Sequence, residues 1–504
     1  MVSLNEIRIL QLGDRDWNFE YIIPDNIVLD HVCSFLELPE EVYHLYFLDR
    51  TPLEEETELL YRAVKAYSLF VTDKVACSGK VEWLCRSRKA QRIASEDIQR
   101  FLLQEAGFYY TAPYGDKFEL GDLGINRGFR GAVKWNGNCG VTLTGAFGDV
   151  MRQAVFWRYN RPVSRGQVLD LWLEYRKKGN VSVSLEVIQF AAGSAEEVLD
   201  HWKFDEADLE HIIQIENKHD SGNLSFSIKA RGEGALQIIA LHQRLSRGSH
   251  GFFLPGGERY VTSEREEIFA YFEPGDLKPP LNVYFSGYKT KQGFEGYFQM
   301  KRLGCPFLLL SEARLEGGGF YMGSGEYESL FTHVIRKYMD ELGFTGEQVI
   351  FSGLSMGTYG ALYYGCDFTP HALILGKPLA SIGNVAVNEK YLRPAGFPTS
   401  LDVLRYHCDG MGASEVEELN KRFWDKFDGA DWGRSKLIVS YMLEDDYDPD
   451  AYERLCSHLR SGGTRLYGKG IHGRHNDNTG AIVKWFISQF EQVLSEDFAR
   501  RIEE

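Results

Sequence analysis

The sequence lacks the features of a membrane-spanning or secreted protein. It contains no run of about 18 apolar residues, and residues 1–25 lack the basic start and long apolar stretch of a signal peptide. Its eight cysteines include no C-x-x-C pair, which excludes the common zinc-knuckle and thioredoxin-type motifs. We therefore expect a cytoplasmic protein with reduced thiols and no bound metal.

Positive charge is also scarce. The chain has 56 Lys and Arg against 72 Asp and Glu, a formal net charge of -16. Nucleic acids and anionic membranes are bound through clustered cations, so this balance argues against both as direct partners. Residues 1–106 contain neither a G-x-G-x-x-G nor a P-loop motif, and we assign no nucleotide cofactor there.

The length of 504 residues predicts about three domains rather than one. Residues 1–106 are predicted to form a small α/β domain, because the apolar runs at 7–13, 44–49 and 67–73 are typical of buried strands. Residues 107–260 show two-residue alternation and glycine-rich turns, which predict a β-sandwich. Aromatic residues in this second domain are compatible with a carbohydrate-binding module, although core packing is the favoured interpretation.

Residues 261–504 have a third pattern, in which strand-like runs alternate with helical segments. This succession is the signature of βαβ units and predicts a mostly parallel sheet, here in an α/β-hydrolase-like catalytic domain. The strand-like runs lie at 281–287, 306–312, 348–353, 372–378, 436–443 and 464–470. The predicted fold is thus α/β plus all-β.

The motif that points to chemistry is G-L-S-M-G at 353–357. It follows a predicted strand and precedes a small-residue helix, so Ser355 is expected on the tight strand-to-helix turn of an α/β-hydrolase. The amide of Met356 would then stabilise an oxyanion, with a second amide near Gly287 and Tyr288. The glycines at 317–319 are expected to shape the acyl pocket or to form a mobile loop.

A serine nucleophile needs an imidazole base and an acid, which follow in that fold in the order serine, acid, histidine. The acid is expected in E-D-D-Y-D after the strand at 436–443, where Glu444 lies closest to the strand end and Asp446 fits the usual spacing. For the base, His475 is favoured over His472 because it adjoins the helix-capping residues 476–478. Each motif alone is compatible with an ordinary turn or a solvated loop, but their order favours a triad.

Several strings together are more distinctive than the serine motif. The segments IRILQLGDRDW, FSGLSMGTYGALYYG, EDDYD and GRHNDN resemble the family of second Asp components of the accessory Sec system of Gram-positive bacteria, along the whole chain. The resemblance implies Ser355 as nucleophile, His475 as base and Glu444 as acid, with Asp446 as the competing acid from spacing.

The same resemblance implies O-acetylation of N-acetylglucosamine on a serine-rich-repeat glycoprotein adhesin, with an acetyl donor of unknown identity. It also implies a part in adhesin export, with the first and third Asp proteins and the accessory Sec motor ATPase as partners. Location would be cytoplasmic, or peripheral at the membrane through that complex. Two alternatives remain open: a non-enzymatic scaffold in the export complex, and an ordinary cytosolic carboxylesterase.

Overall fold

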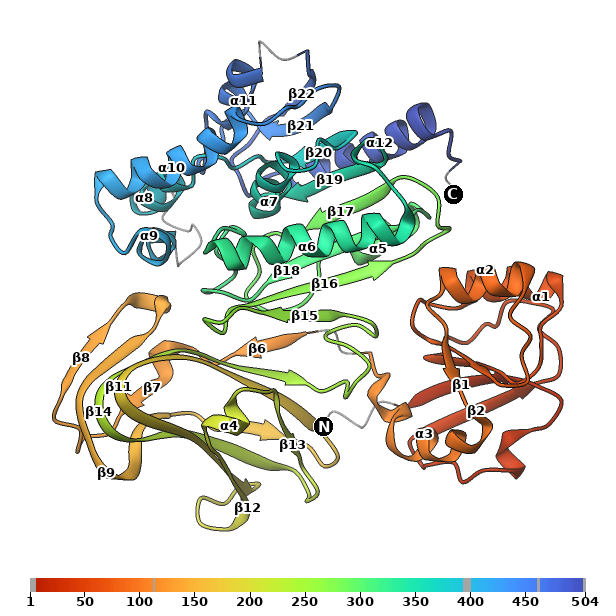
Figure 1. Cartoon of the computed structure of the whole chain (residues 1–504), viewed down its shortest axis with the longest axis horizontal. Helices are drawn as coiled ribbons and strands as arrows, with labels where there is room; N and C mark the ends of the chain where they lie inside the picture. The colour runs from red at the N-terminus through yellow and green to blue at the C-terminus, as the bar shows by residue number, and fades with distance from the viewer. Residues whose placement is uncertain (1–5, 112–113, 393–399, 460–462, 502–504) are drawn as a thin grey trace.

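The computed structural model describes residues 6–111, 114–392, 400–459 and 463–501. The chain forms three units, each built on its own β-sheet, and Figure 1 shows them from red at the N-terminus to blue at the C-terminus. The predicted mixture of α/β and all-β structure is confirmed, while residues 1–5 of the first predicted domain lie outside the described ranges. None of the helices in these ranges combines the length and the apolar composition that a bilayer span requires.

The first unit is a five-stranded parallel sheet in the order β2-β1-β3-β4-β5. Helices α1 (Glu54–Ala63) and α2 (Gly79–Ser87) pack on one face, and α3 (Ile98–Gln104) packs on the other. Because both faces are covered, its central strands are nearly continuous runs of apolar residues. The strands are β1 (Ile7–Leu12), β2 (Ile27–Val32), β3 (Leu45–Leu48), β4 (Leu69–Thr72) and β5 (Gln91–Ile93).

The middle unit differs from the predicted sandwich because a single nine-stranded antiparallel sheet forms both layers. Its long strands β9 (Val141–Trp157), β11 (Val168–Ala191) and β14 (Gly222–Leu245) run through a bend, and both halves of β11 contribute to one core. The remaining strands and the α-helix are β6 (Gly115–Lys117), β7 (Leu123–Ile125), β8 (Ala132–Trp135), β10 (Arg161–Val163), β12 (Val198–Phe204), α4 (Glu206–Leu209) and β13 (Ile213–Glu216).

Glycines allow the bend. Gly179 has φ 83° in β11, and Gly232 and Gly234 have φ 94° and 148° in the facing part of β14. A methyl group on Gly232 would lie only 1.8 Å from the carbonyl oxygen of Asn180, so no larger residue fits this close approach. The glycine-rich strings that predicted turns therefore lie, at these positions, inside continuous strands.

The third unit contains an eight-stranded sheet in the order β15-β16-β18-β17-β19-β20-β21-β22. The six predicted strands are confirmed as β17 (Leu281–Phe285), β18 (Phe307–Glu312), β19 (Val349–Leu354), β20 (Ala372–Gly376), β21 (Lys436–Met442) and β22 (Arg465–Ile471). The sequence missed β15 (Glu258–Val261) and the antiparallel β16 (Glu267–Glu273). The domain boundary predicted at 260 falls inside β15, so the third unit begins earlier than expected.

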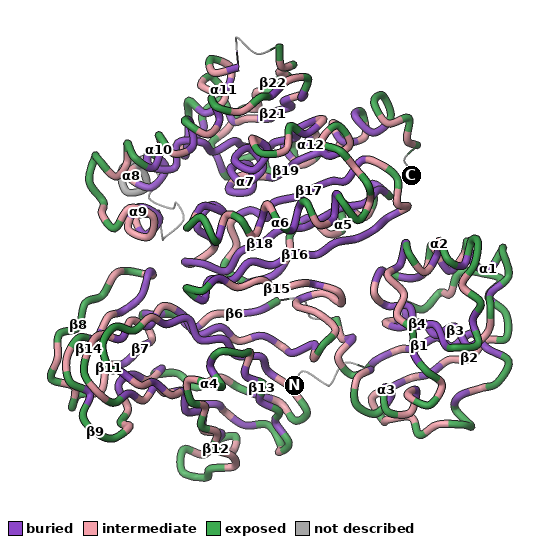
Figure 2. The backbone as a smooth tube through the Cα atoms, viewed as in Figure 1, coloured by how far each residue is buried: buried purple, intermediate pink, exposed green. Residues whose placement is uncertain are grey.

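Helices cover both faces of this sheet, and Figure 2 shows its central strands in the purple of buried residues. Helices α6 (Gly325–Leu342), α7 (Met356–Gly365), α8 (Ile382–Leu392), α9 (Ser400–Cys408), α10 (Ala413–Asp428) and α11 (Ala451–Leu459) pack with one core. Helices α5 (Tyr297–Arg302) and α12 (Thr479–Phe498) pack with the other. The predicted closing helix is thus confirmed. Because the strands are mostly parallel, the loops after β17, β19, β21 and β22 meet at one edge.

Candidate active site

Ser355 lies on the turn between β19 and α7, as the sequence predicts. Its backbone has φ 52° and ψ -120°, a strained conformation for a residue with a side chain. The surrounding hydrogen bonds hold it there: its amide donates to the Gly376 oxygen at 2.8 Å, and its carbonyl accepts from the Thr358 amide at 2.9 Å. Ser355 is half-buried on this turn.

The glycines on either side of Ser355 are required by close backbone contacts. A methyl group on Gly353 would lie 2.3 Å from the backbone of Gly357, and one on Gly357 would lie 2.1 Å from the Phe285 oxygen. Both distances are far inside van der Waals contact. The two glycines of the motif therefore allow β19, α7 and the end of β17 to pack closely together.

Three side chains form a hydrogen-bonded chain that starts at Ser355. Its Oγ lies 2.8 Å from Nε2 of His475, and Nδ1 of that ring lies 2.9 Å from Oδ2 of Asp445. His475 is 1% exposed and Asp445 is 8% exposed, and the ring of Tyr447 stacks on the imidazole at 4.1 Å between centroids. The geometry is that of a hydroxyl, an imidazole and an orienting carboxylate.

Asp445 is held in its ionised form. Burial by itself would raise its pKa, but the hydrogen bond and charge of His475 and the amides of Tyr447 and Asp448 lower the pKa below its usual value. These two amides donate to Oδ1 at 2.8 and 3.3 Å, and Nδ1 of the imidazole lies closer to Oδ2, at 2.9 Å, than to Oδ1, at 3.2 Å. The turn after β21 thus fixes both the position and the charge of this carboxylate.

The two acids expected from the sequence, Glu444 and Asp446, contact other groups. The predicted acid is therefore corrected to Asp445. Glu444 is exposed and pairs with Nδ1 of His472 at 3.0 Å, at the surface. Asp446 accepts a hydrogen bond from the backbone amide of His475 at 3.0 Å. Strand β21 already ends at Met442, so the chain turns before residue 444 and strand alternation no longer decides which carboxylate faces inward. Of the two histidines, the structure brings His475 to Ser355.

The expected oxyanion donors also need one correction. Met356 is the first residue of α7, so its amide has no acceptor within the helix and lies next to the serine. The amide of Gly287 donates instead to Oε2 of Glu295 at 2.6 Å. The Gly287 amide therefore already has a carboxylate acceptor, and a second oxyanion donor at Tyr288 stays a prediction.

The loop at 317–319 lies beside this site and is anchored, which favours a shaping role over a mobile one. A methyl group on Gly318 would lie 2.6 Å from the Cε of Met356, and the Gly319 amide donates to Oε1 of Glu312 at 2.8 Å. Nε2 of His407 lies 2.8 Å from the Gly319 oxygen. Burial and the charge of Arg314 lower the pKa of His407 to about 3, so this imidazole is neutral and donates to that oxygen.

One group in the described part of the chain brings three metal-ligating side chains together: Glu174, His242 and Glu267, all buried. Its charges do not suit a cation, because Arg244 donates to Glu267 through two nitrogens and Arg259 also pairs with that carboxylate. Burial would raise the pKa of Glu267, but these arginines lower it. The group is therefore a buried ion-pair cluster between the middle and third units.

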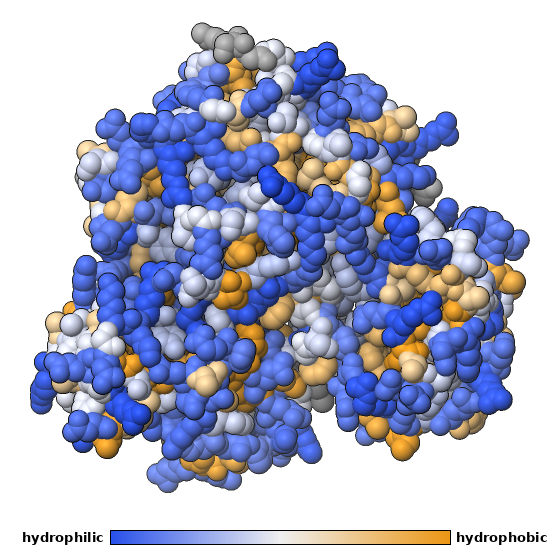
Figure 3. All heavy atoms as spheres, in the orientation of Figure 1, coloured by the Kyte–Doolittle hydropathy of each residue, from blue (hydrophilic) through white to orange (hydrophobic). Residues whose placement is uncertain are grey.

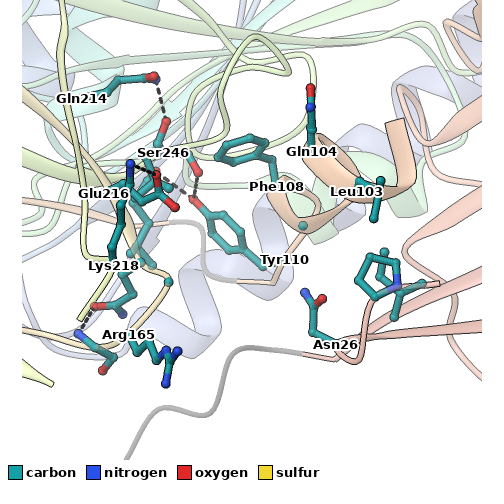
Figure 4. Close-up of a pocket in the computed structure, with 18 of the residues that line it drawn as sticks. Asn26, Leu103, Gln104, Phe108, Tyr110, Arg165, Gln214, Glu216, Lys218 and Ser246 are labelled. Carbon is teal, nitrogen blue, oxygen red and sulfur yellow. Dashed lines mark hydrogen bonds and ion pairs between the residues drawn. The ribbon is translucent and has the colours of Figure 1, made fainter. Parts of the chain in front are cut away.

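A large cavity lies away from Ser355, between the first and middle units. Its volume is about 760 Å³, and Figure 4 shows Asn26 and Arg165 on facing walls of it. Polar side chains line it together with the aromatic rings of Phe108, Tyr110 and Trp202. Elsewhere, Figure 3 shows a mostly hydrophilic face with small scattered apolar areas.

The fold and site define a class of protein. A serine on a strained strand-to-helix turn, linked through a histidine to a buried carboxylate in the order Ser-Asp-His, is the arrangement found in serine hydrolases and acyltransferases of the α/β type. Comparison then places the chain in a particular family. Residues 7–500 match the model of the family of second Asp proteins, described as the accessory Sec system GspB-transporter, and the chain belongs to this family.

Individual relatives agree with that assignment. The second Asp protein of the accessory Sec system of Streptococcus gordonii is 38% identical over 99% of both chains. The protein of the same name from Staphylococcus aureus is 38% identical over 78% of this chain and 75% of its own length. A solved chain from the Glycosylation Associate Protein (Gap123) complex of Streptococcus agalactiae is 34% identical, with a TM-score of 0.88, covering 98% of this chain and 99% of that one.

Proposed function

We propose that this chain is a serine-dependent acetyltransferase that acts on the glycans of a serine-rich-repeat adhesin and also takes part in its export. The observation that carries the enzymatic half is the chain from Ser355 through His475 to Asp445, which is the machinery for activating a hydroxyl. Membership of the family of second Asp proteins of the accessory Sec system supports the export half.

The reaction proceeds in two acyl transfers. Ser355 Oγ attacks the acetyl carbonyl of an activated donor while His475 Nε2 takes its proton, and the resulting oxyanion accepts a hydrogen bond from the Met356 amide. The leaving group departs with the proton from His475. A hydroxyl of N-acetylglucosamine then attacks the acetyl-serine, gives its proton to His475, and releases Ser355, which regains that proton.

The enzymatic proposal is tested on the adhesin itself. In a strain carrying Ser355→Ala, mass spectrometry should find adhesin glycans without O-acetyl groups. His472→Ala is the matched control, because this exposed histidine pairs with Glu444 and not with Ser355. Unchanged acetylation in the Ser355→Ala strain would refute the proposal.

The export role requires partners, and the family context points to the first and third Asp proteins, the accessory Sec motor ATPase and the adhesin. The solved relative from Streptococcus agalactiae is part of the Gap123 complex, which supports assembly with other Asp proteins. We expect a Ser355→Ala strain to export the adhesin while a strain without the chain does not. Equal failure of both strains would contradict a separate export role.

The interdomain cavity favours a binding role that needs no catalysis. Its walls carry Asn26 and Gln104 from the first unit and Arg165 and Glu216 from the middle unit, together with the partly buried ring of Trp202. Aromatic rings with a few polar side chains are a common lining of binding pockets. Trp202→Ala should weaken adhesin binding in pull-down assays and leave the reactivity of Ser355 unchanged.

An ordinary carboxylesterase remains the other enzymatic interpretation of the same site. Transferase and hydrolase share the acyl-enzyme and differ only in whether a sugar hydroxyl or water attacks it. Fast turnover of varied aryl acetates without adhesin would favour the esterase. Slow aryl acetate turnover, together with acetylation of the adhesin, would favour the transferase.

A further inference from the structure

The loop that follows β17 borders the nucleophile. We call residues 286–296 the β17 loop. It leaves the sheet where Phe285 pairs with Gly353, and a methyl group on Gly287 would lie 3.1 Å from the oxygen of Leu354, the residue before Ser355. A change in this loop therefore reaches the serine turn directly.

Contacts within the third unit fix the inner part of the β17 loop. The hydroxyl of Tyr321 donates to the Ser286 oxygen at 2.6 Å, and the hydroxyl of Ser311 donates to the Gly293 oxygen at 2.7 Å. Glu295 accepts from the Gly287 amide inside the loop. We call residues 289–292, which lie between these contacts in the sequence, the outer part of the loop.

The middle unit holds this outer part through its short strand β6. Gly115 and Gln292 exchange two backbone hydrogen bonds of 3.0 and 2.8 Å, like residues in adjacent antiparallel strands. Asp116 pairs with Lys291, and Nζ of Lys117 donates to the Ala313 oxygen at 3.1 Å, in the neighbouring loop after β18. Three successive residues of β6 thus contact the two loops that flank the site.

The side chain of Gln292 joins the β17 loop to the buried ion-pair cluster. It is 5% exposed, its Oε1 accepts from Nε of Arg244 at 2.8 Å, and its Nε2 lies 2.6 Å from Nδ1 of His242. Arg244 is in turn held by Glu267 at the start of β16. Buried polar contacts of this kind keep their geometry because leaving them unmade is costly.

We propose that the middle unit positions the β17 loop for the reaction at Ser355, and that Gln292 is the residue through which it does so. The inference rests on the proposed function, because the position of the loop affects a reaction only if Ser355 reacts. Gln292 acts through the loop and is a positioning residue. Errors of about 1 Å in such supporting structure lower rates by about 100-fold.

The test uses the full chain and two reagents that need neither the acetyl donor nor the adhesin. A fluorophosphonate labels an activated serine by forming an O–P bond and expelling fluoride, with the serine proton passing to His475. Hydrolysis of an aryl acetate separates kcat from KM. The variants are Gln292→Ala, the surface variant Asp116→Asn and Ser355→Ala, with Asn138→Ala as the control because its hydrogen bond to Asp402 links the same two units away from the β17 loop.

We expect Gln292→Ala to lower the labelling rate and kcat by about 10- to 100-fold with KM nearly unchanged, since the loss falls on the transition state. Asp116→Asn should lower the labelling rate and kcat by about threefold, which is the effect expected from losing a partly exposed ion pair. It removes only a surface contact and so remains informative if Gln292→Ala does not fold. Asn138→Ala should match the unaltered chain.

Different failures have different meanings. Absence of Ser355-dependent labelling in the unaltered chain would overturn the proposed function together with the positioning role. Normal labelling in the unaltered chain, in folded Gln292→Ala and in Asp116→Asn would overturn the positioning role alone. An equal loss in Asn138→Ala would also overturn it, because the effect would then reflect general contact between the units.

Discussion

Replacing Asp445 by asparagine tests the assignment of the acid most directly. The new side chain keeps an oxygen for the amides of Tyr447 and Asp448, so the turn after β21 should remain folded. Its nitrogen replaces Oδ2 and donates to Nδ1 of His475. The imidazole must then carry its hydrogen on Nε2, where it can no longer accept the proton of Ser355.

The expected magnitude follows from this reversed tautomer. Loss of the correct tautomer in serine triads lowers kcat by about 10⁴-fold, or about 5 kcal/mol of transition-state stabilisation. The melting temperature should change little, because the two amide contacts and the volume of the side chain are retained. The assay is the rate of Ser355 labelling by a fluorophosphonate, followed by intact mass.

The two acids predicted from the sequence are the matched controls. Glu444→Gln changes only exposed contacts, the pair with His472 and the hydrogen bond from the Gly473 amide, which limits the expected loss to about fivefold. Asp446→Asn keeps an oxygen for the His475 amide and should behave similarly. If Glu444→Gln abolished labelling while Asp445→Asn did not, the hydrogen-bond argument would be refuted.

Three further predictions concern folding and pH. Gly357→Ala places a methyl group 2.1 Å from a backbone oxygen of β17, so we expect a loss of at least about 2 kcal/mol in urea unfolding, and an unchanged midpoint would contradict the packing. Arg244→Met leaves Glu267 buried with fewer cations and should cost about 3–5 kcal/mol, part of which the double variant with Glu267→Gln should restore. Burial alone would raise the pKa of Glu56, but Arg50 and two backbone amides lower it from 4.5 to about 2. A lowered carboxyl pKa adds stability above pH 4.5 that is lost as the pH falls toward 2, so the melting temperatures of the unaltered chain and Arg50→Gln should converge over that range.

Local sequence patterns were sufficient to predict a structural feature where the contacts that fix it lie within one motif. The serine turn could be predicted because its conformation requires glycine at 353 and 357, and these residues are close together in sequence. The buried strands of the third unit could be predicted because parallel strands covered on both faces are continuous apolar runs. His475 was identified by its neighbours at the start of the last helix.

Other features depended on contacts between distant segments. Alternation in the middle unit showed that strands were present, but glycines such as Gly232 were interpreted as turns because only the facing strand reveals a bend. The antiparallel strand β16 was missed because the sequence around it does not show the alternation of strands and helices that marks βαβ units. Gln292 carried no signal at all, since its role comes from β6 and β14, which lie far from it in sequence.

Short-range sterics and hydrophobic periodicity made the three sheets, the strained serine and the order of the groups that follow it predictable from the residues alone. Which of three consecutive carboxylates meets the imidazole depended on how distant segments pack. Glu444, Asp445 and Asp446 have the same chemistry and nearly the same place in the chain. A single turn after β21 exposes the first, buries the second against His475 and gives the third to a backbone amide.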